Sequence, residues 1–282
     1  MYALVLGWFF IFGAIIGSFL NVVIYRLHTG KSLSGRSHCL SCAERLHWYE
    51  LVPIVSYCAL RGRCRSCRAR ITVRYALVEI MTGALFAWIA SSFLFDPVLL
   101  VLNLAIVSLL VVVLVYDLRH TIIPDELVLY LLAYAAAYVL WDPFARAIAL
   151  PPLDALLGGL VPALFFGSIW FFSRGRAMGL GDAKLVLPLG MVVGFMGSFS
   201  LVACAFWIGA LVGLVLVGVS ALQRHAGIRR LARGKLRLPF LHTPLTMGSE
   251  VPFAPFLILA FLLVHLAGID VLDVVGSLIS FP

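Results

Sequence analysis

Two aspartates, Asp117 and Asp182, lie at the ends of apolar stretches, where a charged side chain is costly and usually serves a function. Asp117 closes one stretch, and Asp182 opens another directly after Gly179 and Gly181. Two carboxyl groups held close together do not both ionise easily, so they share one proton. The ionised group can activate water while the protonated group donates to a carbonyl oxygen. The pair could therefore hydrolyse a peptide bond, although an aspartate at a helix end is also a common capping residue.

Four of the six cysteines form two Cys-x-x-Cys pairs, Cys39 with Cys42 and Cys64 with Cys67. Four thiolates at this spacing are typical of a closed, tetrahedral zinc site. Two disulfides are the alternative, but the distribution of basic residues places this segment in the cytoplasm, where disulfides are rare. So short a segment cannot bury a sufficient core unaided, and a metal would contribute most of its folding free energy. We predict a structural zinc.

A third acidic residue, Glu79, lies five residues after Arg74, near the start of another apolar stretch. Its position makes it a candidate functional residue. An ion pair with Arg74 or Lys184 is the structural alternative. Asp125, which follows Pro124, is instead predicted to cap the helix that begins there.

The elements that position these residues are apolar helices. Hydrophobic residues make up 63% of the chain and charged residues 12%, whereas a soluble domain has about half and a quarter. A membrane-spanning helix needs about 20 mostly apolar residues. Breakers divide the chain into apolar segments near 2–25, 75–95, 98–116, 126–141, 155–173, 183–199, 200–222 and 252–269. We predict an all-α polytopic membrane protein with about eight transmembrane helices and a small zinc-ribbon-like insert in the cytoplasm.

The basic residues indicate the orientation of these helices. With the N-terminus outside, 20 of the 21 Lys and Arg residues fall on the cytoplasmic side, and Arg146 alone falls outside. Asp117 and Asp182 then lie at the cytoplasmic ends of their helices, at similar depth. The net charge of +8 is thus a signal of topology rather than of nucleic-acid binding, and no nucleic acid is expected as a partner.

Three regions follow from this division. Residues 1–25 form the first transmembrane helix, 26–73 the cytoplasmic insert, and 74–282 a membrane domain of about seven helices. The basic loop 223–246 could bind the anionic headgroups of membrane lipids.

Small residues at a spacing of four should allow close helix packing, at Gly13 with Gly17, Gly190 with Gly194, and Gly209 with Gly213.

Several of these motifs together resemble one family, the bacterial type IV prepilin peptidases. Residues 179–184, Gly-Leu-Gly-Asp-Ala-Lys, look like the family's GxGD signature, and Asp117 with Pro124 and Asp125 looks like its first active-site motif. Residues 17–26, Gly-Ser-Phe-Leu-Asn-Val-Val-Ile-Tyr-Arg, are similar to its N-terminal signature. The paired cysteines, residues 71–75 with Glu79, and residues 252–256 also match. The resemblance covers almost the whole chain.

This resemblance implies an intramembrane aspartic endopeptidase of the bacterial inner membrane, with Asp117 and Asp182 as the catalytic pair. Its substrates would be type IV prepilins and type II secretion pseudopilins, whose short leader is removed at the cytoplasmic face. The complete cysteine set resembles that of members that then methylate the new N-terminus with S-adenosylmethionine. The site for this methyl donor is not evident in the sequence, and Glu79 is the candidate.

Two functions of other classes compete with this interpretation. A proton- or cation-coupled transporter would place its carboxylates near the middle of the bilayer, often within inverted repeats. A non-catalytic assembly factor would use the zinc-bearing insert to dock cytoplasmic partners. Neither alternative explains two aspartates at one face of the membrane together with the glycines before Asp182.

Overall fold

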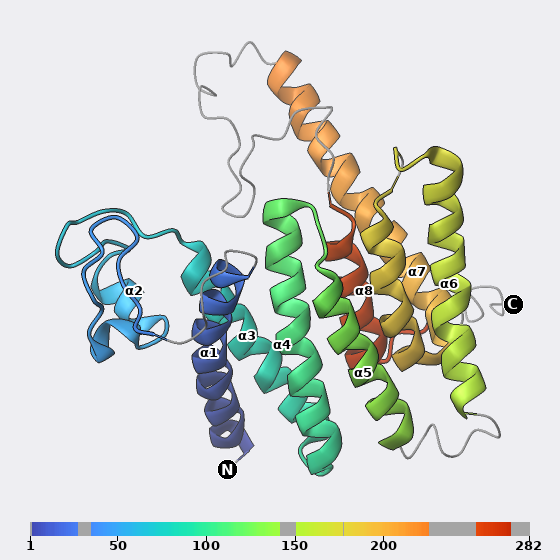
Figure 1. Cartoon of the computed structure of the whole chain (residues 1–282), viewed down its shortest axis with the longest axis horizontal. Coiled ribbons are helices and arrows are strands. Elements are labelled where there is room, and N and C mark those ends of the chain that lie inside the picture. The colour runs from blue at the N-terminus through green and yellow to red at the C-terminus, as the bar shows by residue number, and fades with distance from the viewer. Residues whose placement is uncertain (1, 28–34, 142–150, 177, 226–251, 272–282) are drawn as a thin grey trace, which may run out of the picture. The chain divides into compact units, whose positions relative to one another are not determined.

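The computed structural model describes residues 2–27, 35–141, 151–176, 178–225 and 252–271. These residues are almost entirely helical, and their only β contacts are two isolated bridges in the cysteine insert. The predicted all-α fold is therefore confirmed. Arg146 and nearly all of the basic loop 223–246 lie outside the described residues. The chain forms two compact units, residues 1–115 and 116–282, which are described in turn (Figure 1).

The first unit contains two long helices, α1 (Tyr2–Arg26) and α3 (Arg74–Phe93), which pack closely because glycines line their contact. A Cβ on Gly17 would lie 2.9 Å from the Cα of Glu79, and one on Gly83 would lie 2.8 Å from the Phe10 carbonyl oxygen. In lipid, such small residues let helix backbones approach each other. The prediction that Gly17 allows close packing is confirmed, and the contact fixes Glu79 against α1.

The insert between α1 and α3 holds only short helical elements, η1 (Trp48–Leu51) and α2 (Val55–Ala59). Helix α4 (Pro97–His120) starts after Asp96, whose Oδ1 accepts hydrogen bonds from the backbone N–H groups of Val98 and Leu99. This side chain caps the helix N-terminus, and Pro97 suits its first turn. The division between the two units falls near the end of α4, so that Asp117 belongs to the second unit.

The second unit contains four further helices, α5 (Asp125–Trp141), α6 (Pro151–Ser173), α7 (Leu180–His225) and α8 (Ala254–Ala267). Helix α7 is interrupted at Gly194, whose φ of 76° and ψ of 178° do not occur in a helix. The backbone N–H of Phe195, freed by this break, donates to the carboxylate of Asp154 on α6 at 3.3 Å. A Cβ on Gly194 would lie 2.5 Å from Oδ2 of Asp154.

The contacts of α7 with α6 show that the chain reverses direction at Gly194. Before the break, Gly190 packs against Gly158, so this part of α7 runs antiparallel to α6. After the break, the ring of Phe206 lies 5.9 Å from that of Phe166, so the second part runs back alongside α6. The predicted boundary near residues 197–200 is wrong by a few residues, because the carboxylate that binds the exposed N–H lies opposite Phe195.

Five helices in the described residues are long and apolar enough to cross a membrane, namely α1, α3, α4, α6 and α7. Helix α5 has 17 residues and α8 has 14, and both are apolar. Since α7 consists of two antiparallel parts, the described residues contain eight apolar helical segments, in agreement with the prediction. The chain is therefore a polytopic membrane protein.

Candidate functional site

Asp117 lies in the last turn of α4 and is almost buried, with 5% of its surface exposed. The helix ends at His120, and Thr121, with a positive φ of 54°, donates its N–H to the Asp117 carbonyl at 2.7 Å. Within the part of the chain that the structure describes, Oδ2 of Asp117 is buried and has no hydrogen-bond partner. A buried polar atom without a hydrogen-bond partner is uncommon in folded proteins. A catalytic role is one known reason for such an atom.

Asp182 lies in the first turn of α7, and 8% of its surface is exposed. Its carboxylate accepts a hydrogen bond from the backbone of Gly179. The N-terminal end of a helix carries unpaired N–H groups and a partial positive charge, which favour an ionised carboxylate. The turn through Gly179 and Gly181 therefore positions Asp182 at this helix end.

The structure brings these two aspartates together. The charge of Asp182 acts on the carboxyl group of Asp117, which requires the two groups to be close. Gly181 packs against the segment that follows α4, since its Cβ position lies 3.3 Å from side-chain carbons of Ile123. A larger residue at 181 would move Asp182 away from α4. Both aspartates thus belong to the second unit, and their action as a catalytic pair stays a prediction.

A second contact links the same two segments. Nζ of Lys184 lies 2.7 Å from Oδ1 of Asp125, and both side chains are exposed. The prediction that Asp125 is the N-cap of α5 is wrong, because the Pro124 carbonyl already accepts the N–H groups of Leu127 and Val128. Asp125 is instead the first helical residue. Sequence reasoning missed this ion pair because it placed Lys184 near Glu79.

Glu79 lies in the second turn of α3 and is 8% exposed. Its Oε2 accepts the backbone N–H of Ile54 at 2.8 Å, and the side chain of Ser18 also hydrogen-bonds to it. Ile54 has φ 62° and ψ −51°, and its neighbour Val55 donates to the Pro53 carbonyl at 2.5 Å. This is the rare γ-turn with positive φ, a strained conformation for a branched residue. Glu79 therefore holds the cysteine insert on α3.

The four paired cysteines converge in the insert. Their Sγ atoms all lie within 4.8 Å of one another, and those of Cys39 and Cys67 are 3.9 Å apart. Tetrahedral zinc with Zn–S bonds of about 2.3 Å requires sulfur atoms about 3.8 Å apart. All six cysteines are described, and none forms a disulfide. The donor set therefore fits a metal ion of this kind.

The two cysteine pairs share one backbone pattern. Cys39 donates to Glu44 and accepts from Ala43, and Cys64 donates to Ala69 and accepts from Arg68. An isolated bridge closes each turn, between His38 and Arg45 and between Arg63 and Arg70. Ala43 and Arg68 both have positive φ. Two equivalent turns thus present the four sulfur atoms to one centre.

Backbone N–H groups also favour the thiolate form of Cys39. Hydrogen bonds from the backbone of Cys42 and Ser41 lower the pKa of the Cys39 thiol to about 6. A thiolate is the form that binds metals, and at neutral pH Cys39 is largely in that form. The neighbouring His38 and His47 are not part of the cluster, and His47 stacks on Tyr49 at a ring distance of 5.3 Å.

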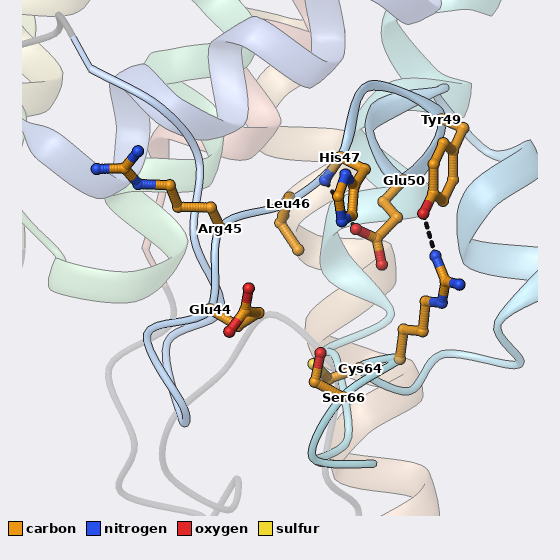
Figure 2. Close-up of a pocket in the computed structure, with 9 residues that line it drawn as sticks. Glu44, Arg45, Leu46, His47, Tyr49, Glu50, Cys64 and Ser66 are labelled. Carbon is orange, nitrogen blue, oxygen red and sulfur yellow. Dashed lines mark hydrogen bonds between the residues drawn. The ribbon is translucent and has the colours of Figure 1, made fainter.

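A cavity of about 400 Å³ lies beside the metal centre (Figure 2). Its lining residues are Glu44, Arg45, Leu46, His47, Tyr49, Glu50, Cys64, Arg65 and Ser66. Arg65 donates a hydrogen bond to the hydroxyl of Tyr49 and also lies over its ring, 5.4 Å from the centroid. Figure 2 shows the Arg45 side chain directed away from the other labelled residues. The cavity offers two carboxylates and a stacked aromatic pair to a small molecule.

Comparison with known proteins gives matches along most of the chain. Residues 11–93 match the bacterial peptidase A24 N-terminal domain, and residues 104–214 match the type IV leader peptidase family. The boundary between the two matches lies near the division between the two units. No solved structure matches the chain.

Three relatives carry the printed name prepilin leader peptidase/N-methyltransferase. The protein of Burkholderia pseudomallei strain 1026b is 33% identical over 278 residues, covering 88% of this chain and 80% of the relative. That of Bacillus subtilis strain 168 is 32% identical over 282 residues, covering 96% and 95%. That of Myxococcus xanthus strain DK1622 is 37% identical over 215 residues, covering 74% and 62%. With this identity over nearly the full length of two relatives, the chain belongs to the type IV leader peptidase family.

Proposed function

We propose that this protein is an intramembrane aspartic endopeptidase that removes the leader of type IV prepilins and type II secretion pseudopilins. One observation carries the proposal. Oδ2 of Asp117 is buried without a hydrogen-bond partner, and the carboxylate of Asp182 lies close enough for the two charges to interact. The name of the relatives supports prepilins as substrates, whereas pseudopilins are included because of the motifs that resemble the family.

The two carboxyl groups would divide the work of hydrolysis between them. Asp182, at a helix N-terminus and hydrogen-bonded by Gly179, is suited to be the ionised partner that takes a proton from water. Asp117, buried in the last turn of α4, is suited to hold the shared proton and donate it to the scissile carbonyl oxygen. Water then adds to the carbonyl carbon, and the peptide bond breaks as its nitrogen takes up a proton.

The site would face the cytoplasm from within the bacterial inner membrane. This orientation is supported by the placement of 20 of the 21 Lys and Arg residues on one side in a topology of eight helices. A prepilin that inserts its apolar helix into lipid would then present the junction with its leader at the membrane border. Gly179, whose Cβ position lies 3.8 Å from the nearest atom, Oδ2 of Asp182, leaves room there for a peptide backbone.

A second reaction, methylation of the new N-terminal amine, would follow in the first unit. S-adenosylmethionine would supply an electrophilic methyl group when bound. The cavity beside the four cysteines would take such a donor, since Glu44 and Glu50 line it and can face a sulfonium cation. Glu79 remains the candidate to hold the amine, although its Oε2 already accepts the N–H of Ile54. Zinc at the four cysteines would keep the insert folded.

The experiment is to incubate the purified protein with a synthetic prepilin and to follow leader release by mass spectrometry, with and without S-adenosylmethionine. Wild type should release the leader, and Asp117→Asn and Asp182→Asn should each lower the rate at least about 1000-fold while the protein stays folded. With the donor, the product should gain the mass of one methyl group. A wild type that never releases leader would favour a transporter or an assembly factor instead.

A further inference from the structure

The cysteine insert exposes large apolar side chains in one short segment, residues 48–55. Trp48 is 79% exposed and Val55 63%, and Tyr49, Leu51 and Val52 are exposed as well. Soluble proteins rarely expose a continuous apolar patch of this kind unless it binds something. The metal centre and the turns around it leave these side chains outside the insert's own core.

The same segment is fixed to a membrane helix. The N–H of Ile54, in the strained γ-turn, donates to Oε2 of Glu79 at 2.8 Å. Glu79 lies five residues beyond Arg74, the first residue of α3, which places it about 7.5 Å along the helix axis. Helix α3 is one of the five helices able to cross a membrane. The segment 48–55 is thus held at the level where α3 enters the lipid.

The charges around the segment identify what it faces. Residues 35–73 contain two acidic residues, Glu44 and Glu50. The same residues contain seven exposed arginines, which are Arg36, Arg45, Arg61, Arg63, Arg65, Arg68 and Arg70. A surface that combines this positive charge with exposed Trp and Tyr matches the border of a bilayer that contains anionic lipids. It does not attract the basic leader of a prepilin.

We propose that residues 48–55 are a membrane-interface anchor. The indole of Trp48 and the side chains of Leu51, Val52 and Val55 enter the headgroup region of the leaflet next to the insert. The arginines of the insert bind anionic headgroups, and the bond from Ile54 to Glu79 sets the depth of the anchor. This anchor fixes the insert on the membrane independently of the peptidase reaction.

The first test measures the depth of Trp48 in the full-length protein. Wild type and Trp48→Phe are placed in nanodiscs of phosphatidylcholine, with or without 30% phosphatidylglycerol, that carry bromine at either shallow or deep positions of the acyl chains. The emission that disappears in Trp48→Phe belongs to Trp48 alone. We expect shallow bromines to quench it at least twice as strongly as deep ones, and phosphatidylglycerol to increase the quenching. Equal emission with and without bromine in both lipid mixtures would overturn the proposal.

The second test follows amide hydrogen exchange in the same nanodiscs. Amides 48–55 should exchange at least tenfold more slowly with phosphatidylglycerol than without, and Val55→Asp should remove the difference. Leu40→Asp is the matched control, since Leu40 is 60% exposed on the same insert but outside the segment. Metal content checks that both variants keep the insert folded. An equal loss in Leu40→Asp, or slow exchange only after prepilin is added, would contradict the anchor.

Discussion

Lys184 binds Asp125 at 2.7 Å and so joins the segment after Asp117 to α7, the helix that carries Asp182. Because 41% and 74% of the two side chains are exposed, the pair should contribute less than about 1 kcal/mol to stability. Asp125→Asn should therefore slow leader cleavage less than about tenfold, in contrast to Asp117→Asn. Steady-state cleavage of a synthetic prepilin measures both. A loss in Asp125→Asn as complete as that in Asp117→Asn would place Asp125 in the reaction.

Gly181 should tolerate no larger side chain. A Cβ there would lie 3.3 Å from Cγ1 and Cδ1 of Ile123 and would shift the turn that positions Asp182. A displacement of about 1 Å can slow catalysis about 100-fold, so Gly181→Ala should slow cleavage by between ten- and 100-fold. Adding Ile123→Val removes Cδ1 and should recover part of the rate. The idea fails if the double variant is no faster than Gly181→Ala.

The contact of Gly158 with Gly190 should govern the stability of the second unit. A Cβ on Gly190 would overlap the carbonyl oxygen of Gly158, a backbone atom that cannot move aside. Gly190→Ala should therefore cost at least about 1–3 kcal/mol and lower the melting temperature. Gly167→Ala, on the neighbouring helix α6, is the control, because no atom lies within 4 Å of its Cβ position. Thermal unfolding in detergent compares the two, and equal melting temperatures would disprove the close contact.

Glu79 should act first as a structural residue of the insert. Glu79→Ala leaves the N–H of Ile54 without its acceptor, at a cost of about 1–3 kcal/mol, whereas Glu79→Gln keeps an acceptor oxygen. Hydrogen exchange at residues 53–60 should rise in Glu79→Ala and stay near wild type in Glu79→Gln. Methyl transfer then tests the chemical role separately. Normal methylation by Glu79→Gln would exclude the carboxylate as a partner of the new amine.

The metal centre should bind one metal ion per chain and release it in acid. Cys42→Ser should lose the metal, whereas Cys58→Ser, outside the cluster, should keep it. Protons compete with the metal for the thiolates, so metal release should increase as the pH falls. Elemental analysis after gel filtration at several pH values measures this. Full metal content in Cys42→Ser would contradict a site of four thiolates.

The sequence was sufficient for the helices and for the cluster of four cysteines. Hydropathy, together with the helix-breaking residues between apolar segments, located every long helix to within a few residues. A membrane-spanning segment must be long and apolar, and it must satisfy its backbone hydrogen bonds internally, which favours a helix. The convergence of the four cysteines followed from their spacing. The pairing of Asp117 with Asp182 stays a prediction, made because the expected topology puts the last turn of α4 and the first turn of α7 on the same side of the membrane.

Side-chain partners could not be predicted in the same way. Asp154, near the start of α6, binds the backbone N–H of Phe195 at the break of α7. Glu79 was a candidate functional residue, with an ion pair to Arg74 or Lys184 as the alternative, and it accepts a backbone N–H from Ile54. Both partners are main-chain groups freed by an unusual local conformation. The sequence does not show which backbone N–H groups will lack a helical partner, because that depends on the local backbone conformation.

The loop-free reversal of α7 has a consequence for how the protein is made. No charged residue occurs between Lys184 and Arg224, so neither half of α7 offers the translocation machinery a polar boundary at which to pause. We expect the two halves to enter the bilayer as one hairpin. Because α6 is made before α7, Asp154 is already in place to accept the N–H of Phe195 at the turn of the hairpin.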